Sequence, residues 1–288
     1  MLGPSWCAMN SRKILQGLVF FFTSLLGFVF VFHVLVPSAQ PVLTKADYQT
    51  RKVQQFSYVA LGDSLTQGVG DTTNQGGFVP LVAQSLTNEE GYQVDVKNFG
   101  VAGNTSNQIL KRMKEQAEIA DALSKADLMT LTVGGNDLRK VILDNITSLK
   151  ISTFKKPSVA YSKRLVEIIE LARKDNPDLP IYVLGIYNPF YLNFPEMTDM
   201  QTIVDNWNQT TQDTIAKFDK VYFVPINDLL YQGIDGQEGI VQTSGDEKKI
   251  INDALYQEDN FHPNNTGYEI MKRAVLEKIR ETKDNWKN

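Results

Sequence analysis

The feature that most constrains this chain is a run of 23 residues, Ile14 to Val36, that contains no Asp, Glu, Lys or Arg. As a helix with a rise of ~1.5 Å per residue it would reach about 35 Å, enough to cross a hydrocarbon core of ~30 Å. We predict that residues 14–36 form a transmembrane signal anchor. A cleaved signal peptide is an alternative, although its apolar region is normally only ~7–15 residues long. A buried globular helix is the third interpretation.

The charges that flank this run do not decide its orientation by count. Arg12 and Lys13 adjoin its first end, whereas Lys45, Arg51 and Lys52 follow its second end at a greater distance. We predict that residues before the run are cytoplasmic, because the basic pair adjoins the membrane edge as in a secretory signal. The main domain then lies outside the cell on a single-pass anchor, or is secreted if the run is cleaved.

Beyond the run, the chain divides into a linker and one larger domain. With the N-terminus at 1–13 and the anchor at 14–36, the polar residues 37–55 predict a linker, and residues 56–288 predict the domain. Short apolar runs alternate there with longer amphipathic stretches. The predicted strands are Phe56–Ala60, Val94–Asn98, Leu128–Val133, Ile181–Gly185 and Val221–Val224. This alternation predicts an α/β fold in which helices cover both faces of a parallel sheet.

Helical spacing of apolar residues predicts the helix faces that pack on this sheet. One predicted face consists of Leu110, Met113, Ala117 and Ala120. A second consists of Tyr161, Leu165, Ile168, Ile169 and Ala172. A final helix follows Asn264, with Tyr268, Met271, Val275 and Ile279 on one side.

Composition excludes several classes of function. A net charge of -4 and a pI of about 5.4 lack the basic footprint of a nucleic-acid-binding protein, so we expect no nucleic-acid partner. The single cysteine, Cys7, excludes an intramolecular disulfide. The two histidines, His33 and His262, are far apart and cannot build a zinc site of the usual kind. We predict neither a metal nor a cofactor.

Three polar segments follow predicted strands, where open parallel sheets form their sites. Residues 61–68 (LGDSLTQG) could expose the Ser64 hydroxyl beside backbone N–H groups, or Ser64 could be a helix N-cap. Residues 98–105 (NFGVAGNT) could aim a glycine N–H at a ligand oxyanion, or form a plain loop into a helix. In residues 133–137 (VGGND), Asn136 could donate to an oxyanion or belong to a simple turn.

A fourth segment, residues 258–264 (EDNFHPN), precedes the final helix. Asp259 and His262 are three residues apart, so the carboxylate could bind one imidazole nitrogen while the other faces a nucleophile. A solvated loop is the alternative. Because His33 lies in the apolar run, any histidine general base must be His262.

In this joint order the four segments resemble the SGNH, or GDSL-type, esterase/lipase family, from about Phe56 to Arg280. The resemblance implies a three-layer αβα sandwich with a flavodoxin-like sheet of about five strands. It also implies an ester hydrolase that forms an acyl-enzyme.

The resemblance further implies a role for each matching residue. Ser64 of Gly-Asp-Ser-Leu would be the nucleophile, and Gly103 of Ala-Gly-Asn-Thr and Asn136 of Gly-Gly-Asn-Asp would join it as oxyanion-hole donors. His262 of Asp-x-x-His-Pro would be the base, with Asp259 as its orienting acid. A small-molecule, lipid or glycan ester would be the substrate.

The sequence leaves the substrate and the oligomeric state open. We favour an ester with an apolar acyl group; a carbohydrate or cell-wall O-deacetylase on the same site is an alternative, and a non-catalytic, membrane-tethered binding module is another. Two segments are predicted to shape the pocket. Tyr187–Met200 is rich in aromatic residues and fits an acyl pocket, a lid or core packing. Tyr231–Gln257 is polar and rich in glycine, which predicts a flexible loop.

Overall fold

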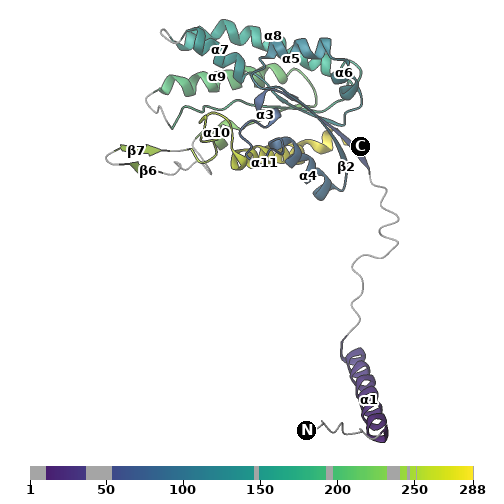
Figure 1. Cartoon of the computed structure of the whole chain (residues 1–288). Helices are drawn as coiled ribbons and strands as arrows, with labels where there is room; N and C mark the ends of the chain where they lie inside the picture. Colours follow the sequence, from purple (N-terminus) through teal and green to yellow (C-terminus); the bar gives the residue numbers. More distant parts are fainter. Residues whose placement is uncertain are drawn as a thin grey trace, which may run out of the picture. The chain divides into compact units, whose positions relative to one another are not determined.

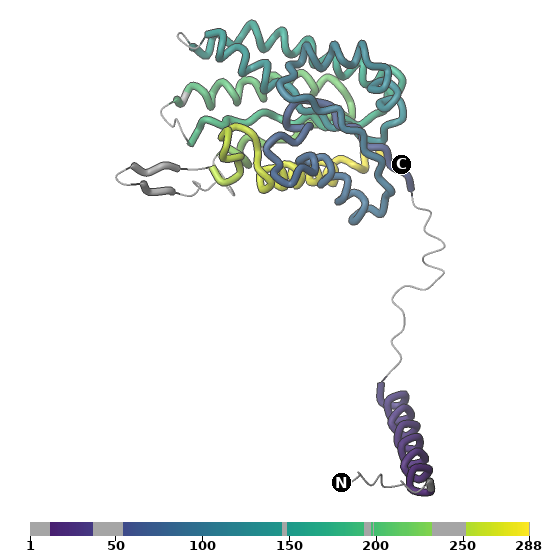
Figure 2. The backbone as a smooth tube through the Cα atoms, viewed as in Figure 1, coloured from purple at the N-terminus to yellow at the C-terminus, as the bar shows by residue number. Residues whose placement is uncertain are grey.

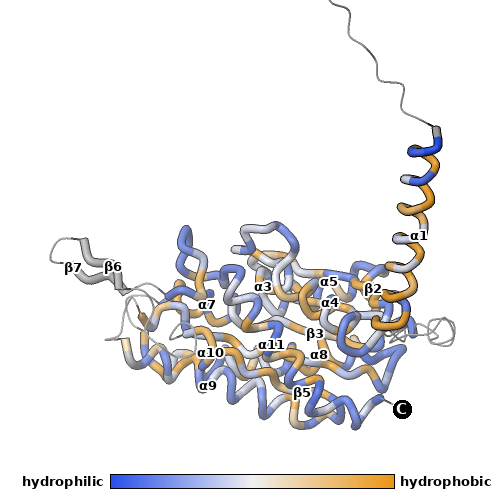
Figure 3. Tube along the Cα trace, turned by 90° about the horizontal axis from the view of Figure 1, so that it is seen from below, coloured by the Kyte–Doolittle hydropathy of each residue, from blue (hydrophilic) through white to orange (hydrophobic). Residues whose placement is uncertain are grey.

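The computed structural model describes residues 11–36, 54–145, 149–192, 197–231, 241–244, 247–250 and 252–287. The chain divides into two compact units, Met1–Lys52 and Val53–Asn288. In the first unit the described residues form one helix, α1 (Ser11–Leu35), whose apolar side chains are exposed. Figure 3 shows α1 as apolar along most of its length, and Arg12–Leu35 is long and apolar enough to cross a membrane. Most of the predicted linker lies outside the described residues.

The second unit is built on a five-stranded parallel sheet (Figure 1). Its strands are β1 (Gln55–Gly62), β2 (Gln93–Gly100), β3 (Leu128–Thr132), β4 (Ile181–Leu184) and β5 (Val221–Val224). Their order across the sheet is β2-β1-β3-β4-β5, which is the flavodoxin-like order. The predicted sheet is confirmed, and every predicted strand end lies within two residues of the observed one.

Strand β1 shows why the sheet is covered on both faces. Successive side chains of a strand point to opposite faces. Val59 and Leu61 belong to one hydrophobic core, whereas Tyr58 and Ala60 belong to the other, and all four are fully buried. The strand therefore reads as a continuous apolar run, as expected inside a parallel sheet.

Two groups of helices complete the three layers. Side chains from α5 (Ser106–Glu115), α6 (Ala117–Ser124), α8 (Lys155–Ala172) and α9 (Thr198–Ile215) build the first core. Those from α4 (Phe78–Glu90) and α11 (Asn265–Thr282) build the second, and these two helices lie side by side in Figure 2. The remaining helices are α3 (Ser64–Gln67), α7 (Gly135–Asp144), α10 (Asn227–Leu230) and the 3-10 turns η1 (Ile151–Phe154) and η3 (Lys283–Asn285). The fold is an αβα sandwich.

One of the three predicted helix faces is wrong. The backbone leaves the helical region at Gln116 (φ −104°, ψ 100°), so α5 and α6 are separate helices. Ala117 and Ala120 are exposed, and Ile119 and Leu123 are buried in their place. The break resets the helical phase, so a spacing counted across it does not describe one face. The predicted faces of α8 and α11 are confirmed, because every named residue on them is buried.

The polar segment 231–257 contains an antiparallel pair of strands, β6 (Val241–Ser244) and β7 (Glu247–Ile250), where the sequence predicts a flexible loop. Valine, threonine and isoleucine in these strands favour extended backbone. Residues 232–240, 245–246 and 251 of the segment lie outside the described residues.

Two glycines allow α3 to pack on the ends of the strands. A Cβ on Gly62 would lie 2.2 Å from Thr132 Oγ1, and a Cβ on Gly100 would lie 2.2 Å from the backbone N of Gln67. Both distances are shorter than a real contact allows. Only glycine therefore lets α3, and with it Ser64, sit directly on the carboxyl edge of β1 and β2.

We expect Gly100→Ala to lower the free energy of unfolding by about 1–3 kcal/mol, because the backbone of Gln67 must move to admit the methyl group. Urea denaturation of the full chain in detergent measures the change. Gly135→Ala is the control, because its Cβ would meet Ile186 Cγ2 at an ordinary 3.8 Å. Equal stabilities for the two variants would contradict the packing argument.

Candidate active site

Ser64 begins α3 two residues after the end of β1, an inner strand that lies between β2 and β3. The preceding Asp63 is the N-cap, and its carboxylate accepts from the backbone N–H of Leu65 at 3.1 Å and from Thr132 Oγ1 at 2.8 Å. Ser64 is therefore the first helical residue rather than the cap, and its own N–H has no partner within the helix. Burial raises the pKa of the Asp63 carboxyl, and the bonds from Thr132 and Leu65 only partly offset this.

The imidazole of His262 lies between Ser64 and Asp259. Its Nε2 is 2.9 Å from Ser64 Oγ, and its Nδ1 is 2.6 Å from Asp259 Oδ2. Asp259 Oδ1 accepts from the backbone N–H groups of Phe261 at 2.9 Å and His262 at 3.0 Å. Burial opposes ionisation of Asp259, but these hydrogen bonds outweigh it and lower its pKa. The ionised carboxylate can only accept, so Nδ1 carries the proton and Nε2 is free to accept from the Ser64 hydroxyl.

The segment that carries His262 is held from two sides. The hydroxyl of Tyr187, which follows β4, donates to the Phe261 carbonyl at 2.5 Å. The backbone N–H of Tyr256 donates to the His262 carbonyl at 2.7 Å. Asn264 caps α11 by accepting from Gly267 N at 3.0 Å. The imidazole is thus oriented by backbone contacts as well as by Asp259.

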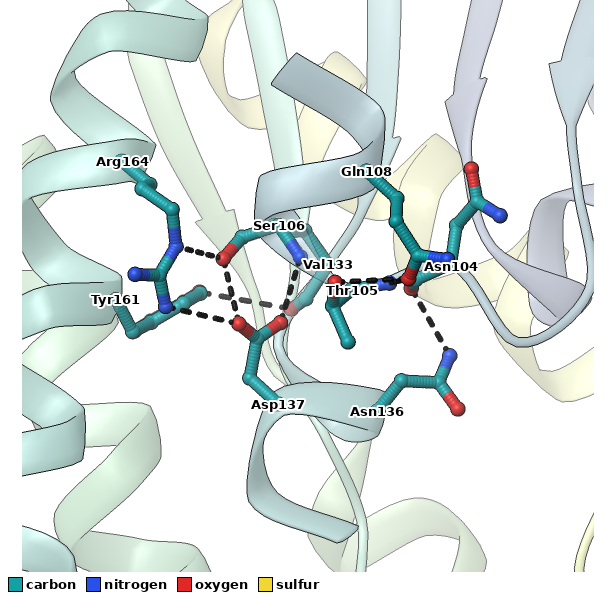
Figure 4. A network of polar contacts seen from close by, with 9 residues as sticks. All are labelled: Asn104, Thr105, Ser106, Gln108, Val133, Asn136, Asp137, Tyr161 and Arg164. Atoms are coloured by element: carbon teal, nitrogen blue, oxygen red, sulfur yellow. Dashed lines mark hydrogen bonds and ion pairs between the residues drawn. The ribbon is translucent and has the colours of Figure 1, made fainter. Parts of the chain in front are cut away.

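Two further predicted site residues, Gly103 and Asn136, line the same cavity as Ser64 and His262. Gly103 lies in the loop between β2 and α5 with φ +77°, a conformation that favours glycine. Asn136 lies in the first turn of α7, and its Nδ2 donates to the carbonyl of Asn104 at 3.1 Å (Figure 4). An amide nitrogen has two hydrogens, so this bond leaves one of them for a ligand.

A cavity of about 510 Å³ adjoins all five predicted site residues, Ser64, Gly103, Asn136, Asp259 and His262. Apart from this group its wall is largely apolar. The apolar lining comprises Ala102, Leu138, Ile142, Leu143, Ile186, Pro189, Phe190, Met200, Val204 and Phe261. The structure thus places a hydroxyl, an imidazole, a carboxylate and an amide in the wall of one largely apolar cavity.

Part of this wall comes from elements that the sequence analysis did not select. The predicted segment 187–200 does line the cavity, through Tyr187, Asn188, Pro189, Phe190 and Met200, whereas the described residues of 231–257 do not. The α7 helix supplies Leu138 and Ile142, which no predicted pocket segment includes. Leu138 and Ile142 are four residues apart and follow Asn136 closely, so helical spacing could have placed both on one face beside the site.

A loop between α3 and α4 connects the serine segment to the histidine segment. Oδ2 of Asp71 accepts from the N–H groups of Gln75, Gly76 and Gly77, each at 3.0 Å. Its Oδ1 accepts from Nδ2 of Asn265, the first residue of α11, also at 3.0 Å. Asp71 thereby joins the chain just after Ser64 to the chain just after His262. Sequence reasoning missed this link.

Comparison with known proteins gives a consistent set of similarities. A sequence profile of the GDSL-like lipase/acylhydrolase family matches residues 60–270. The uncharacterized protein YpmR of Bacillus subtilis is 31% identical over 235 residues, which cover 81% of this chain and 85% of that protein. The spore germination lipase LipC of Bacillus licheniformis is 26% identical over 226 residues, covering 76% and 94% of the two chains.

Solved structures show the same fold. A lipase from a goat rumen metagenome is similar with a TM-score of 0.61 at 23% identity, over 77% of this chain and 96% of that one. A catalytic mutant of an acetylxylan esterase from Geobacillus stearothermophilus has a TM-score of 0.54 at 19% identity, over 79% and 95%.

We expect the variant Asp71→Asn to be less stable at pH 7 by about 1–3 kcal/mol, because its amide group would face N–H donors. Burial opposes ionisation of Asp71, but bonds from Thr73, Gly77 and Gln75 outweigh it and lower its pKa to about 2. A lowered pKa stabilises the fold above the ordinary Asp pKa of about 4, and this contribution fades as the pH falls towards 2. The difference between wild type and variant should therefore shrink from pH 7 to pH 3.

Urea unfolding of the full chain in detergent at pH 7, 5 and 3 measures this difference. Asp95→Asn is the control, because Asp95 is exposed on the edge strand β2. A stability loss that stays constant over this pH range would show that the Asp71 charge is not the cause.

Proposed function

Since the chain belongs to the GDSL-like lipase/acylhydrolase family, and is thus a carboxylic ester hydrolase, we propose that it hydrolyses esters of apolar acyl groups through an acyl-enzyme on Ser64. The observation that carries this proposal is the hydrogen-bonded series from Ser64 through His262 to Asp259, which lines a largely apolar cavity.

In the first step Ser64 Oγ attacks the ester carbonyl carbon while His262 Nε2 takes the hydroxyl proton. The carbonyl oxygen becomes an oxyanion, which accepts from the backbone N–H groups of Ser64 and Gly103 and from the remaining hydrogen of Asn136 Nδ2. The bond to the alcohol then breaks, and His262 returns its proton to the leaving oxygen. The ionised Asp259 stabilises the imidazolium between these transfers.

In the second step water attacks the acyl-enzyme. His262 takes a proton from the water, the same donors hold the new oxyanion, and the bond between the acyl carbon and Ser64 Oγ breaks. The carboxylic acid leaves, and the proton on His262 returns to Ser64 Oγ. Every atom of this cycle comes from the ester, one water and this chain.

The cavity wall supports an acyl group longer than acetyl. An acetyl group would contact little of the apolar surface that α7, α9 and the loop after β4 provide, and burying apolar surface is worth about 25 cal/mol per Å². A longer chain would cover Leu138, Ile142 and Val204 and gain this energy.

We place the catalytic unit outside the cell, on a membrane anchor. The length and apolar composition of α1 support a spanning helix, and Arg12 and Lys13 support a cytoplasmic N-terminus. Cleavage after the helix would release the same unit as a secreted enzyme. Lipid esters are then substrates within reach of the anchored enzyme.

We expect the full chain in detergent to hydrolyse p-nitrophenyl esters with an optimum beyond acetyl, and Ser64→Ala to lose nearly all of this activity. A fluorophosphonate probe should label the wild type at Ser64 and leave the variant unlabelled. An optimum at acetyl would favour a deacetylase instead. A folded wild type that neither labels nor turns over would favour the binding module.

We expect Asn136→Ala to lower kcat by about 10²–10³-fold with little change in KM, because its donor acts on the oxyanion and not on the ground-state ester. Lys140→Ala is the matched control on α7, because Lys140 is exposed and pairs with Asp144 at 3.3 Å. An unchanged kcat for Asn136→Ala would remove this residue from the mechanism.

A further inference from the structure

The proposed oxyanion donors lie on separate segments, so something must hold these segments at a constant distance. Gly103 belongs to the loop before α5, and Asn136 belongs to α7. One direct link between them is the 3.1 Å bond from Asn136 Nδ2 to the carbonyl of Asn104, the residue after Gly103. That bond involves the donor itself, and by itself it would not fix α5 relative to α7.

Asp137, the next residue of α7, supplies a second link (Figure 4). Its Oδ2 accepts from the backbone N–H of Ser106 at 2.7 Å, and its Oδ1 accepts from the Ser106 hydroxyl at 2.6 Å. Ser106 is the first residue of α5, three residues after Gly103. Two bonds to one residue restrict both distance and angle, so α5 and α7 are held in one relative orientation.

Arg164 of α8 closes the arrangement from a third element. Its Nη2 donates to Asp137 Oδ1 at 3.1 Å, and its Nε donates to Ser106 Oγ at 2.6 Å. α8 lies in the helical layer and packs on the sheet through buried residues such as Leu165 and Ile168. The guanidinium therefore ties the Asp137–Ser106 pair to a rigid part of the core.

Because Ser106, Asp137 and Arg164 are largely buried, their hydrogen bonds cannot easily be replaced by bonds to water. Ser106 is fully buried, the Asp137 side chain is 7% exposed and that of Arg164 is 26% exposed. A buried carboxylate that loses a donor has little water to replace it, so each partner must stay in place. Buried ion pairs contribute little net stability compared with apolar packing, so the effect of this pair lies in the segments that it holds together.

We propose that Asp137 is a positioning residue, whose carboxylate, held by Ser106 and Arg164, sets the separation of the Gly103 N–H from the Asn136 amide. This inference rests on the proposed function, because it requires that both donors act on an oxyanion. A displacement of about 1 Å at a catalytic group can cost ~10²-fold in rate, so a loosened link should be visible in kcat.

The test uses Asp137→Asn in the full chain in detergent, with the p-nitrophenyl ester that the wild type prefers. The amide keeps the size of the side chain but sets an NH₂ against Ser106 or Arg164. We expect kcat to fall about 10–100-fold and KM to stay within about threefold, because the misplaced donors act on the transition state.

A double-mutant cycle separates positioning from general damage. In an Asn136→Ala background, Asp137→Asn should lower kcat by a clearly smaller factor than it does in the wild type, because one of the two donors whose separation it sets is already gone. Equal losses of kcat in the two backgrounds, or an unchanged kcat in the single variant, would overturn the inference.

Asp127→Asn is the matched control. Its carboxylate also accepts from a backbone N–H, that of Ser57 at 2.7 Å, but at the opposite edge of the sheet. We expect its kcat to stay within about twofold of the wild type, because it lies away from the oxyanion donors.

A second variant and the Ser64→Ala control distinguish a folding defect, a failure of the proposed function and a failure of the positioning role. If Asp137→Asn lacks a cooperative urea transition, Ser106→Ala is put through the same cycle, because it removes one hydroxyl and leaves the backbone bond. Ser64→Ala is measured beside them. If it keeps wild-type turnover, the proposed function fails and the inference with it; if it is inactive while the two losses are equal, only the positioning role fails.

Discussion

The hydrogen bond between Ser64 Oγ and His262 Nε2 joins residues 198 positions apart in the chain, and the rest of the fold serves to bring them to 2.9 Å. Ser64 follows the carboxyl end of β1, an inner strand of the sheet, and His262 precedes α11, which packs against one face of that sheet. Parallel strands bring several loops to the same edge, so residues from distant parts of the sequence converge there.

Carboxylates do much of the positioning around this edge. Asp63 joins α3 to β3, Asp71 joins the serine loop to α11, and Asp137 joins α7 to α5. Each accepts hydrogen bonds from more than one donor, which restricts orientation more than a single contact would. Stability comes chiefly from the two apolar cores, whereas these bonds specify where the loops lie relative to one another.

The sequence alone was sufficient for the five strands of the parallel sheet, for the αβα class and for two of the three helix faces, but not for β6 and β7. Those features depend on local periodicity, and Tyr161 and Leu165 or Tyr268 and Met271 follow it within one unbroken helix. The face drawn across Gln116 failed because a single change in backbone dihedral angles there is not visible in the spacing of apolar residues.

The sequence by itself determined which residue types are available for chemistry: one histidine outside the apolar run, and a serine, a glycine and an asparagine in polar segments after strands. Only the tertiary structure decided that Ser64, His262 and Asp259 lie within hydrogen-bonding distance, and that α7 lines their cavity. It also revealed the Asp137–Ser106–Arg164 contacts. The physical reason is that such contacts arise from the packing of segments far apart in the chain, and neither periodicity nor motif spacing encodes a distance between them.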